Sequence, residues 1–258
     1  MRKPFSFNFN NKNSWTDFKI KILEITIPFP KRKESTIKIP GGEDLVEVEG
    51  GYEDITIPVK MDILDKRMIE TKYREIKRWL SIIEDDHLIF SDDLGFFYKV
   101  KMIDLKEFLT EFQACGTATV NFTCSPYLYS VNGEYEIDFE NNLFNEFPLN
   151  AEPVYKIVGN GTIKLNINSR VVTIDLADEI IIDIPRKLTL RNGYFEGKRK
   201  KGEWEDLELI PGDNILSYEL TPGSTLESFT LIPNWRTLWV LNITKGIILI
   251  MNLTVMLL

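Results

Sequence analysis

Cysteine, histidine and alanine are scarce in this 258-residue sequence, and each shortage excludes a class of protein. The two cysteines, Cys115 and Cys124, have no histidine partner and cannot make a zinc site of the usual kind. They lie nine residues apart on a predicted strand and point to opposite faces, so we expect two buried apolar residues and no disulfide between them. With only four alanines, the chain is poorly suited to a helical fold.

The sequence also lacks a cationic excess. Its net charge of −8 argues against nucleic acid as the main partner, because a phosphate-binding surface needs positive charge. One basic run, 198–201, is flanked by Gly197 and Gly202. This favours a solvated loop tip, with an anionic contact as the alternative. No apolar run near the first residue is long enough for a secretory signal, so we expect the protein to fold in the cytoplasm.

Catalytic and cofactor motifs are missing as well. The sequence contains no G-x-S-x-G, P-loop, G-x-G-x-x-G or H-E-x-x-H motif. His87 would have to be the base of any Ser-His-Asp or Cys-His device, and we interpret it as structural or solvated. The acidic groups 84–86 and 92–93 could meet in a calcium site, but a helix end followed by a turn is the simpler reading. We therefore predict no catalytic, cofactor-binding or metal-binding residues, and no enzyme.

What the sequence does contain is β-strand pattern. The hydrophobic content of 43% is enough for a core, and it is rich in β-branched and aromatic residues. In the first half, apolar residues alternate in several short segments. Strands are predicted at 17–27, 36–39, 55–59 (near an edge, because of Pro58), 87–91, 96–102 and 117–124. The turn 92–95 makes a hairpin of the segments on either side of it.

A single helix is predicted over residues 66–84. Ile69, Tyr73, Ile76, Leu80 and Ile83 recur every three or four residues and lie on one face. A helix with one apolar stripe covers a sheet. The first half is therefore predicted to be an α+β domain with one covering helix and one hairpin.

Beyond a turn-rich stretch at 131–153 the pattern is purely β. Strands are predicted at 162–167, 172–176, 180–184, 207, 209, 215–220 and 226–231, with turns at 160–161, 192–193, 211–212 and 222–223. Many short strands separated by turns describe a β-sandwich, so the fold class is mainly β. Four aromatic residues of this half, Trp204, Tyr194, Phe195 and Tyr218, favour core packing, with a sugar-binding platform as the alternative.

Several segments, taken in order, resemble the distal tail protein (Dit) family of siphophages. They are 5–14, 39–42, 51–59, the helix end at 79–80, 88–93, 97–100, 116–127, 152–163, 209–214 and 235–236. Each motif is weak alone, and their order and spacing are more specific. The resemblance covers about residues 1–236.

This resemblance implies an N-terminal ring-forming domain (1–132) and a galectin-like C-terminal β-sandwich (133–236). It implies a structural hub of a phage or prophage tail tip, made in the host bacterial cytoplasm and located in the virion. The expected partners are copies of itself in a homohexameric ring, the tail tube protein, and tail-tip, baseplate and tail-fibre proteins. The alternative is a carbohydrate-binding module that recognises a host cell-wall saccharide.

The sequence departs from the family in an apolar tail, 237–258. Its apolar run, 238–258, is 21 residues long, enough to span a bilayer, but Lys245 near its middle costs about 3 kcal/mol on insertion scales. Other readings are extra strands packed on a partner, or a non-native extension in a decayed prophage gene. We favour a tail that does not span a membrane.

Overall fold

The first half of the chain folds into an antiparallel sheet covered by one helix. The computed structural model describes residues 4–38, 45–63, 69–105 and 117–238. The first sheet has the strand order β2-β1-β7-β8-β9-β6-β3. Its strands are β1 (Phe7–Phe9), β2 (Lys12–Asn13), β3 (Ile20–Ile25), β6 (Ile55–Ile63), β7 (His87–Phe90), β8 (Phe96–Asp104) and β9 (Thr117–Ser130). This sheet and its helix, α1 (Ile69–Ser81), are called the first body below.

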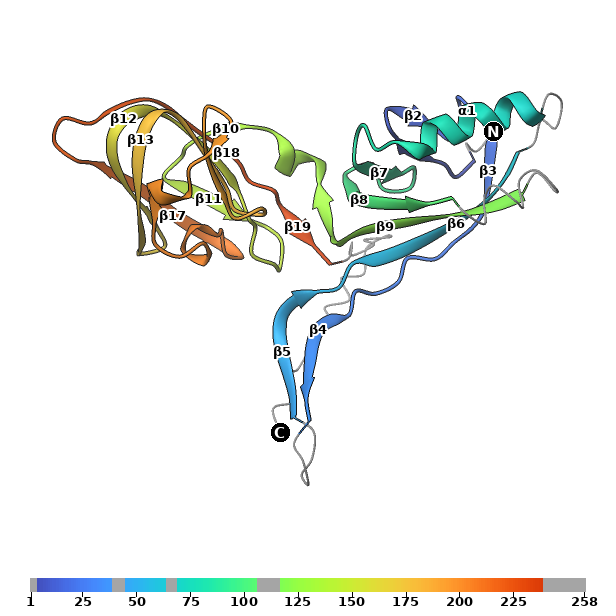
Figure 1. Ribbon diagram of the computed structural model, residues 1–258, viewed down its shortest axis with the longest axis horizontal. Coiled ribbons are helices and arrows are strands. Elements are labelled where there is room, and N and C mark those ends of the chain that lie inside the picture. Colours follow the sequence, from blue (N-terminus) through green and yellow to red (C-terminus); the bar gives the residue numbers. More distant parts are fainter. Residues whose placement is uncertain (1–3, 39–44, 64–68, 106–116, 239–258) are drawn as a thin grey trace, which may run out of the picture.

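The helix lies across the sheet as its apolar stripe predicts (Figure 1). Ile76 and Leu80 are almost fully buried, whereas Ile83 lies beyond the end of α1 and is 37% exposed. Trp79, which the predicted stripe omitted, is the main contact: its Nε1 donates to the carbonyl oxygen of Phe9 at 2.8 Å. Asn10 caps the carboxyl end of the helix: its Nδ2 donates to the carbonyl oxygen of Trp79 at 2.9 Å. A buried carbonyl at a helix end needs such a partner.

The strand alternation of the first body is confirmed at β9. Ala118, Val120, Phe122 and Cys124 are buried on one face, as expected. Cys124 carries a free thiol, while Cys115 lies outside the residues that the structure describes. The predicted hairpin is also confirmed, since β7 pairs with β8 in antiparallel register.

Strand β6 lies near an edge of the sheet, as predicted from Pro58, although it is not the edge strand itself. It lies between β9 and β3 in the strand order. Its ladder with β3 ends at Val59, however, so Pro58 lies just past the last paired residue on that side. A proline without an N–H is tolerated there, because no further ladder hydrogen bond from it is needed.

A separate hairpin projects from the first body. Strands β4 (Arg32–Ile37) and β5 (Leu45–Tyr52) form a two-stranded sheet of their own. It extends away from both halves of the molecule (Figure 1). Its base is held by the N–H of Glu53, which donates to the carbonyl oxygen of Lys31 at 2.8 Å. The short strand predicted at 36–39 thus begins earlier, at Arg32. We call this hairpin the arm.

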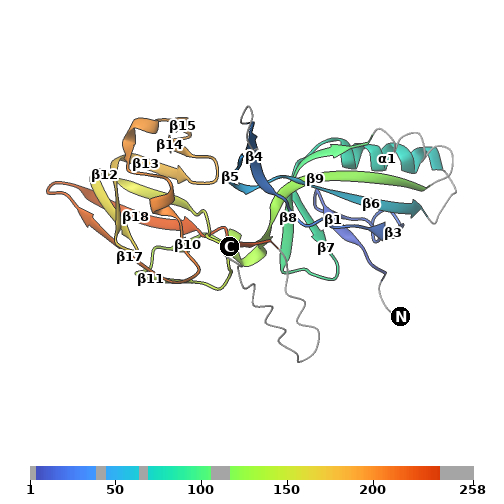
Figure 2. The same ribbon diagram turned by 90° about the horizontal axis from the view of Figure 1, so that it is seen from below.

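The second half of the chain is all β, apart from short 3₁₀ turns (Figure 2). It has its own hydrophobic core. Its elements are η1 (Val131–Glu134), β10 (Ile137–Asp138), β11 (Asn142–Asn145), β12 (Val154–Ile167), β13 (Arg170–Asp183), β14 (Leu188–Arg191), β15 (Tyr194–Phe195), η2 (Gly197–Arg199), β16 (Lys200–Lys201), η3 (Glu205–Leu207), β17 (Gly212–Leu220) and β18 (Thr225–Ile232). Together they are called the second body. Strands β12 and β13 form its long central hairpin, joined at Asn168 and Ser169, whose φ angles of 52° and 70° suit a tight two-residue turn.

Two predictions fail along β12 and β13. Asn160-Gly161 is not a turn but lies inside β12, where the partner strand changes from β18 to β17. The chain crosses closely there: a Cβ on Gly159 would lie 2.2 Å from the carbonyl oxygen of Thr225. The glycines therefore serve a close backbone approach. The strands predicted at 172–176 and 180–184 are one strand, which continues through Asp178 at φ 58°.

The predicted strand residues Leu207 and Leu209 also differ from the structure. Leu207 ends the 3₁₀ turn η3, and its carbonyl oxygen accepts a hydrogen bond from the Tyr155 hydroxyl at 2.9 Å. Leu209 forms only a single bridge, with Ala151. Both leucines are fully buried. Their apolar character therefore indicated burial correctly, but it did not indicate a strand.

The chain finally returns to the first sheet. Strand β19 (Arg236–Thr237) pairs with Tyr129 and Leu128 of β9, beyond the point where β6 ends. The predicted limit at 132 and 133 falls within η1, and the domain limits stay a prediction. Residues 239–258 of the predicted apolar tail lie outside the described part of the chain. Within that part, no helix has the length and apolarity needed to cross a bilayer.

Candidate functional site

The two bodies meet around a polar cleft of about 570 Å³. The first body supplies Tyr127 and Tyr129 of β9 together with Lys99 and Lys101 of β8, and the base of the arm supplies Tyr52. The side of the second body and the returning β19 also contribute to the wall, with Glu152, Val154, Asp183, Pro185, Arg186, Asn234 and Arg236. The cleft is therefore the place where first sheet, arm and second body come together.

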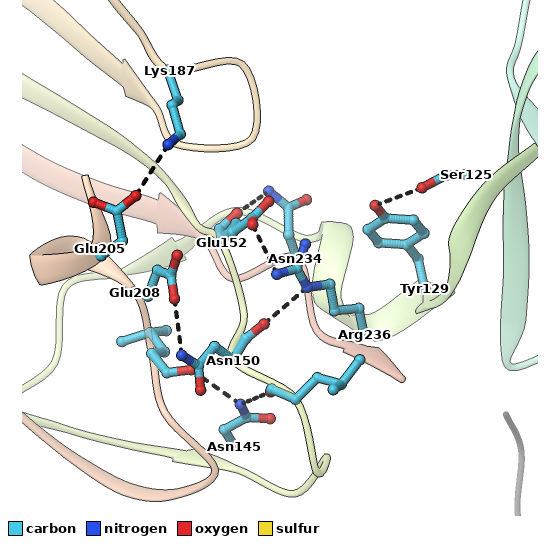
Figure 3. Close-up of polar contacts among 12 residues, drawn as sticks. Ser125, Tyr129, Asn145, Asn150, Glu152, Lys187, Glu205, Glu208, Asn234 and Arg236 are labelled. Atoms are coloured by element: carbon cyan, nitrogen blue, oxygen red, sulfur yellow. Dashed lines mark hydrogen bonds and ion pairs between the residues drawn. The ribbon is translucent and has the colours of Figure 1, made fainter. Parts of the chain in front are cut away.

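Arg236 is the central side chain of this junction (Figure 3). Its side chain is only 9% exposed; Nε donates to the carbonyl oxygen of Asn150 at 2.8 Å, and Nη2 donates to Glu152 Oε1 at 2.8 Å. The guanidinium also lies over the Tyr127 ring, 4.2 Å from its centroid. Burial opposes the charge, but Glu152 outweighs it and raises the pKa of Arg236. A buried cation that is paired and stacked in this way fixes geometry.

The backbone around Arg236 is equally tied. Trp235 accepts a hydrogen bond at its carbonyl oxygen from the N–H of Ser130, at 2.9 Å. The Asn234 N–H donates to the carbonyl oxygen of Gly133 at 2.8 Å, and its Nδ2 donates to that of Glu152. A Cβ on Gly133 would lie 2.6 Å from the nitrogen of Trp235, so only glycine fits this crossing. The outgoing and returning chains are thus bonded to each other.

His87 forms a second clamp at the same junction. Its Nε2 lies 2.5 Å from Glu134 Oε2, and its Nδ1 is hydrogen-bonded to Asp85. The hydrogen bond with Glu134 is the largest cause that raises the pKa of His87 to about 9; partial burial opposes it and Asp85 adds to it. The imidazole is therefore protonated at neutral pH and donates from both nitrogens. A charged ring with both nitrogens engaged cannot act as a general base.

The structure separates the acidic groups that sequence reasoning considered as a calcium site. Asp85 and Asp86 lie beside His87, within ligand distance of one another. Asp93 instead lies in the β7–β8 turn, where its N–H donates to the carbonyl oxygen of Phe90 at 3.1 Å. Hydrogen bonding of Asp85 to the protonated His87 accounts for this acidic cluster without a metal. The expected absence of cofactor and metal sites stays a prediction.

The basic run 198–201 is folded and not a loop tip. It comprises the end of η2 and the strand β16, which pairs with β13. Arg199 pairs with Glu196, and Lys201 lies 3.2 Å from Asp175. Lys200 lies over the Trp204 ring, 4.2 Å from its centroid. Because these charges are paired, the alternative of an anionic contact loses most of its basis.

The aromatic residues of the second body divide between core and surface. Trp204 packs against the core, whereas Tyr218 is 40% exposed with its ring centroid 5.9 Å from that of Phe229. Tyr194 and Phe195 do not pack against the core, being 79% and 67% exposed on the hairpin of β14 and β15. Core packing was therefore the wrong expectation for these two.

Comparison with known proteins identifies the fold. No protein-family model and no curated protein matches the chain. Among solved structures, the Dit protein of phage SPP1 matches with a TM-score of 0.59 at 13% identity, over 89% of this chain and 98% of that chain. That structure is described as a paradigm of the hub adsorption apparatus in phages that infect Gram-positive bacteria. The activated baseplate of phage P2 with Ca matches at a TM-score of 0.42 and 9% identity, over 90% of this chain and 97% of that chain.

The class that these findings define is a mainly-β phage Dit fold. The likeness to SPP1 Dit extends over nearly the whole of both chains, and at this identity it establishes the fold. The match to the P2 baseplate is too distant to add to it. The resemblance first seen in the sequence motifs is therefore confirmed at the level of the fold.

Proposed function

We propose that this chain is a structural hub of a phage tail tip. In this proposal six copies close into a ring that joins the tail tube to the baseplate or receptor-binding apparatus, within the virion. The chain would be made in the cytoplasm of the host bacterium. The fold shared with the SPP1 hub protein supports the proposal.

The arm is the observation that carries the proposal. Within the described residues, β4 and β5 pair only with each other. An isolated two-stranded hairpin is marginally stable in water, because it has no third strand or apolar cover. An arm that projects from the body therefore needs a surface of another molecule (Figure 1).

A second copy of the chain can supply that surface. The first sheet ends in the edge strands β2 and β3, whose outer backbone groups can pair with an added strand. A contact between the arm of one copy and the body of the next joins two unlike surfaces. Contacts of this kind generate closed rings when the rotation between neighbours divides a full turn.

The test removes the arm without disturbing its base. Arg32 and Tyr52 are register partners, so residues 33–51 can be replaced by a two-residue Asn-Gly turn. Light scattering after size exclusion, with negative-stain images, gives the number of subunits. We expect rings of the unaltered chain, and monomers of the armless variant with an unchanged circular dichroism spectrum.

The matched control is Phe144→Ser, which alters a side chain 64% exposed on the second body. This variant should form the same rings as the unaltered chain. Rings that persist without the arm would show that the arm does not carry assembly. A monomeric unaltered chain at high concentration would refute the ring itself.

Saccharide binding by the second body is the second candidate function. It is favoured by the exposed rings of Tyr194 and Phe195. The tip of the Phe195 ring lies close to Gly197, where a Cβ would come within 2.8 Å of Cζ, and the side chain is 67% exposed and accessible to a sugar ring. Binding of the whole chain to a cell-wall glycan array, compared with Phe195→Ser, tests it. Equal binding of the two proteins would exclude this ring as the platform.

A further inference from the structure

The polar cleft between the two bodies carries more positive charge than its own carboxylates balance. Five cations and four carboxylates line it. Three of the cations pair with carboxylates of the cleft: Lys101 with Asp54 at 2.6 Å, Arg186 with Asp183 at 3.2 Å, and Arg236 with Glu152 at 2.8 Å. The fourth carboxylate, Asp86, lies 3.4 Å from the protonated His87. Lys33 and Lys99 therefore remain as surplus cations, in a protein whose net charge is −8.

The two surplus lysines come from different parts of the molecule. Lys33 is an exposed residue of β4 at the base of the arm, and within the described ranges it has no carboxylate at ion-pair distance. Lys99 of β8 lies 3.8 Å from Glu134 Oε1, but Glu134 also pairs with His87. The Nζ of Lys99 lies over the Tyr129 ring, 4.2 Å from its centroid. Ammonium groups without a full partner favour the entry of an anion into the cleft.

Three tyrosine rings line the same cleft. The ring centroids of Tyr52 and Tyr127 are 6.2 Å apart and those of Tyr127 and Tyr129 are 6.3 Å apart, each pair in an edge-to-face arrangement. Arg236 lies over the Tyr127 ring and Lys99 over the Tyr129 ring, whereas no cation of the described residues lies over the Tyr52 ring. Such a ring can pack against the apolar face of a sugar, and tyrosine hydroxyls can donate to anionic oxygens.

The size of the cleft limits what it can hold. Its volume of about 570 Å³ is that of a small-molecule site, for which about 300–1,000 Å³ is usual. A docked protein segment needs a more extended surface. A phosphate group carries up to about two negative charges and three acceptor oxygens, so it can engage two ammonium groups, whereas one carboxylate offers a single charge. The cleft therefore fits a small ligand that has both a phosphate group and a ring.

We propose that this cleft binds a phosphorylated sugar. Lys33 and Lys99 hold the phosphate group, and the Tyr52 ring packs against the sugar. The site differs from the exposed rings of Tyr194 and Phe195, because it supplies charge as well as an aromatic surface. The proposal does not depend on the tail-tip function.

Isothermal titration calorimetry of the full chain tests the class of ligand. The probes are glucose 1-phosphate, N-acetylglucosamine 1-phosphate, inorganic phosphate, the two uncharged sugars and a tetraglutamate peptide. We expect a sugar phosphate to bind at least about tenfold more tightly than inorganic phosphate or its parent sugar. Equal binding of inorganic phosphate would mean a site for a bare anion, and tighter binding of tetraglutamate would mean an acidic peptide. Either result, or no binding of both sugar phosphates, overturns the proposal.

Charge and ring variants then locate the ligand. Lys33→Met and Lys99→Met should each weaken binding of the sugar phosphate about tenfold, because each removes a charge-assisted contact with the phosphate. Tyr52→Ser should lower the affinity to that of inorganic phosphate. The control is Lys164→Met, since Lys164 is exposed on β12 and does not line the cleft. Circular dichroism checks that each variant is folded. If the three cleft variants bind as tightly as Lys164→Met, the ligand lies elsewhere and the proposal is wrong.

Discussion

Replacement of Arg236 by methionine should loosen the second body from the first sheet. Methionine keeps an apolar stem of similar length but removes every donor of the guanidinium. The variant loses the two hydrogen bonds to Asn150 and Glu152 and the contact with the Tyr127 ring. Loss of one partner from a buried pair costs about 3–5 kcal/mol, since the other charge is left behind. The Glu152 side chain is 27% exposed, so hydration of its carboxylate offsets part of this cost. We expect a loss of about 2–4 kcal/mol.

Urea denaturation followed by circular dichroism and tryptophan fluorescence measures this loss. Lys187→Met is the control, because Lys187 and its partner Glu205 are 61% and 57% exposed and the loss of their pair should change the stability little. A double-mutant cycle with Glu152→Gln should give a coupling above about 1 kcal/mol. The reasoning is refuted if Arg236→Met costs no more than Lys187→Met, or if the cycle is additive.

Two further variants test the junction clamp and the strand crossing. The folded-state pKa of His87, about 9, exceeds the ordinary histidine value of 6.5. The stabilisation by His87 is therefore complete below pH 6.5 and is lost as the pH rises through about 9. His87→Gln should therefore cost about 1–2 kcal/mol at pH 6 and little above pH 9, measured by urea denaturation across pH; a constant difference would contradict this assignment. Gly159→Ala should lower the free energy of unfolding by more than about 2 kcal/mol, because its Cβ would meet the carbonyl oxygen of Thr225. The control is Gly95→Ala, whose Cβ would have its nearest contact at 3.8 Å and should change the melting temperature little. Equal changes in melting temperature for the two variants would show that the bulge tolerates a Cβ.

Local patterns predicted much of the first body. The helix at Ile76 and Leu80, the β7–β8 hairpin and the alternation of β9 depend on residues close together in sequence, and the structure confirms all three. Pro58 correctly indicated a strand near an edge, although the rule about proline concerns only one missing N–H. The sheet supplies an unpaired position for that atom without placing β6 at an edge.

The second body shows what a local pattern cannot report. Asn160-Gly161 has the composition of a turn, but the glycines serve a crossing with Thr225, which is far away in the sequence. Leu207 and Leu209 carry an apolar signal that indicates burial, and burial is compatible with a 3₁₀ turn as well as with a strand.

The junction was beyond sequence reasoning for a related reason. Arg236 and Glu152 are 84 residues apart, and His87 and Glu134 are 47 residues apart. A charged residue in a sequence is read as exposed by default, because most are. Arg236 is buried only because β19 returns to the first sheet, and no periodicity of apolar residues in the sequence predicts that return.

The pairing of β19 with β9 also determines how the molecule can be rebuilt. Everything from Val131 to Trp235 leaves the first sheet and re-enters it through two neighbouring strands, whose spacing is about 4.8 Å. Any domain whose two chain ends lie that close together could be joined to the same two strands. The second body is thus an exchangeable cassette: a different fold could take its place while the sheet, the covering helix and the arm keep their sequence and the contacts that they make with one another.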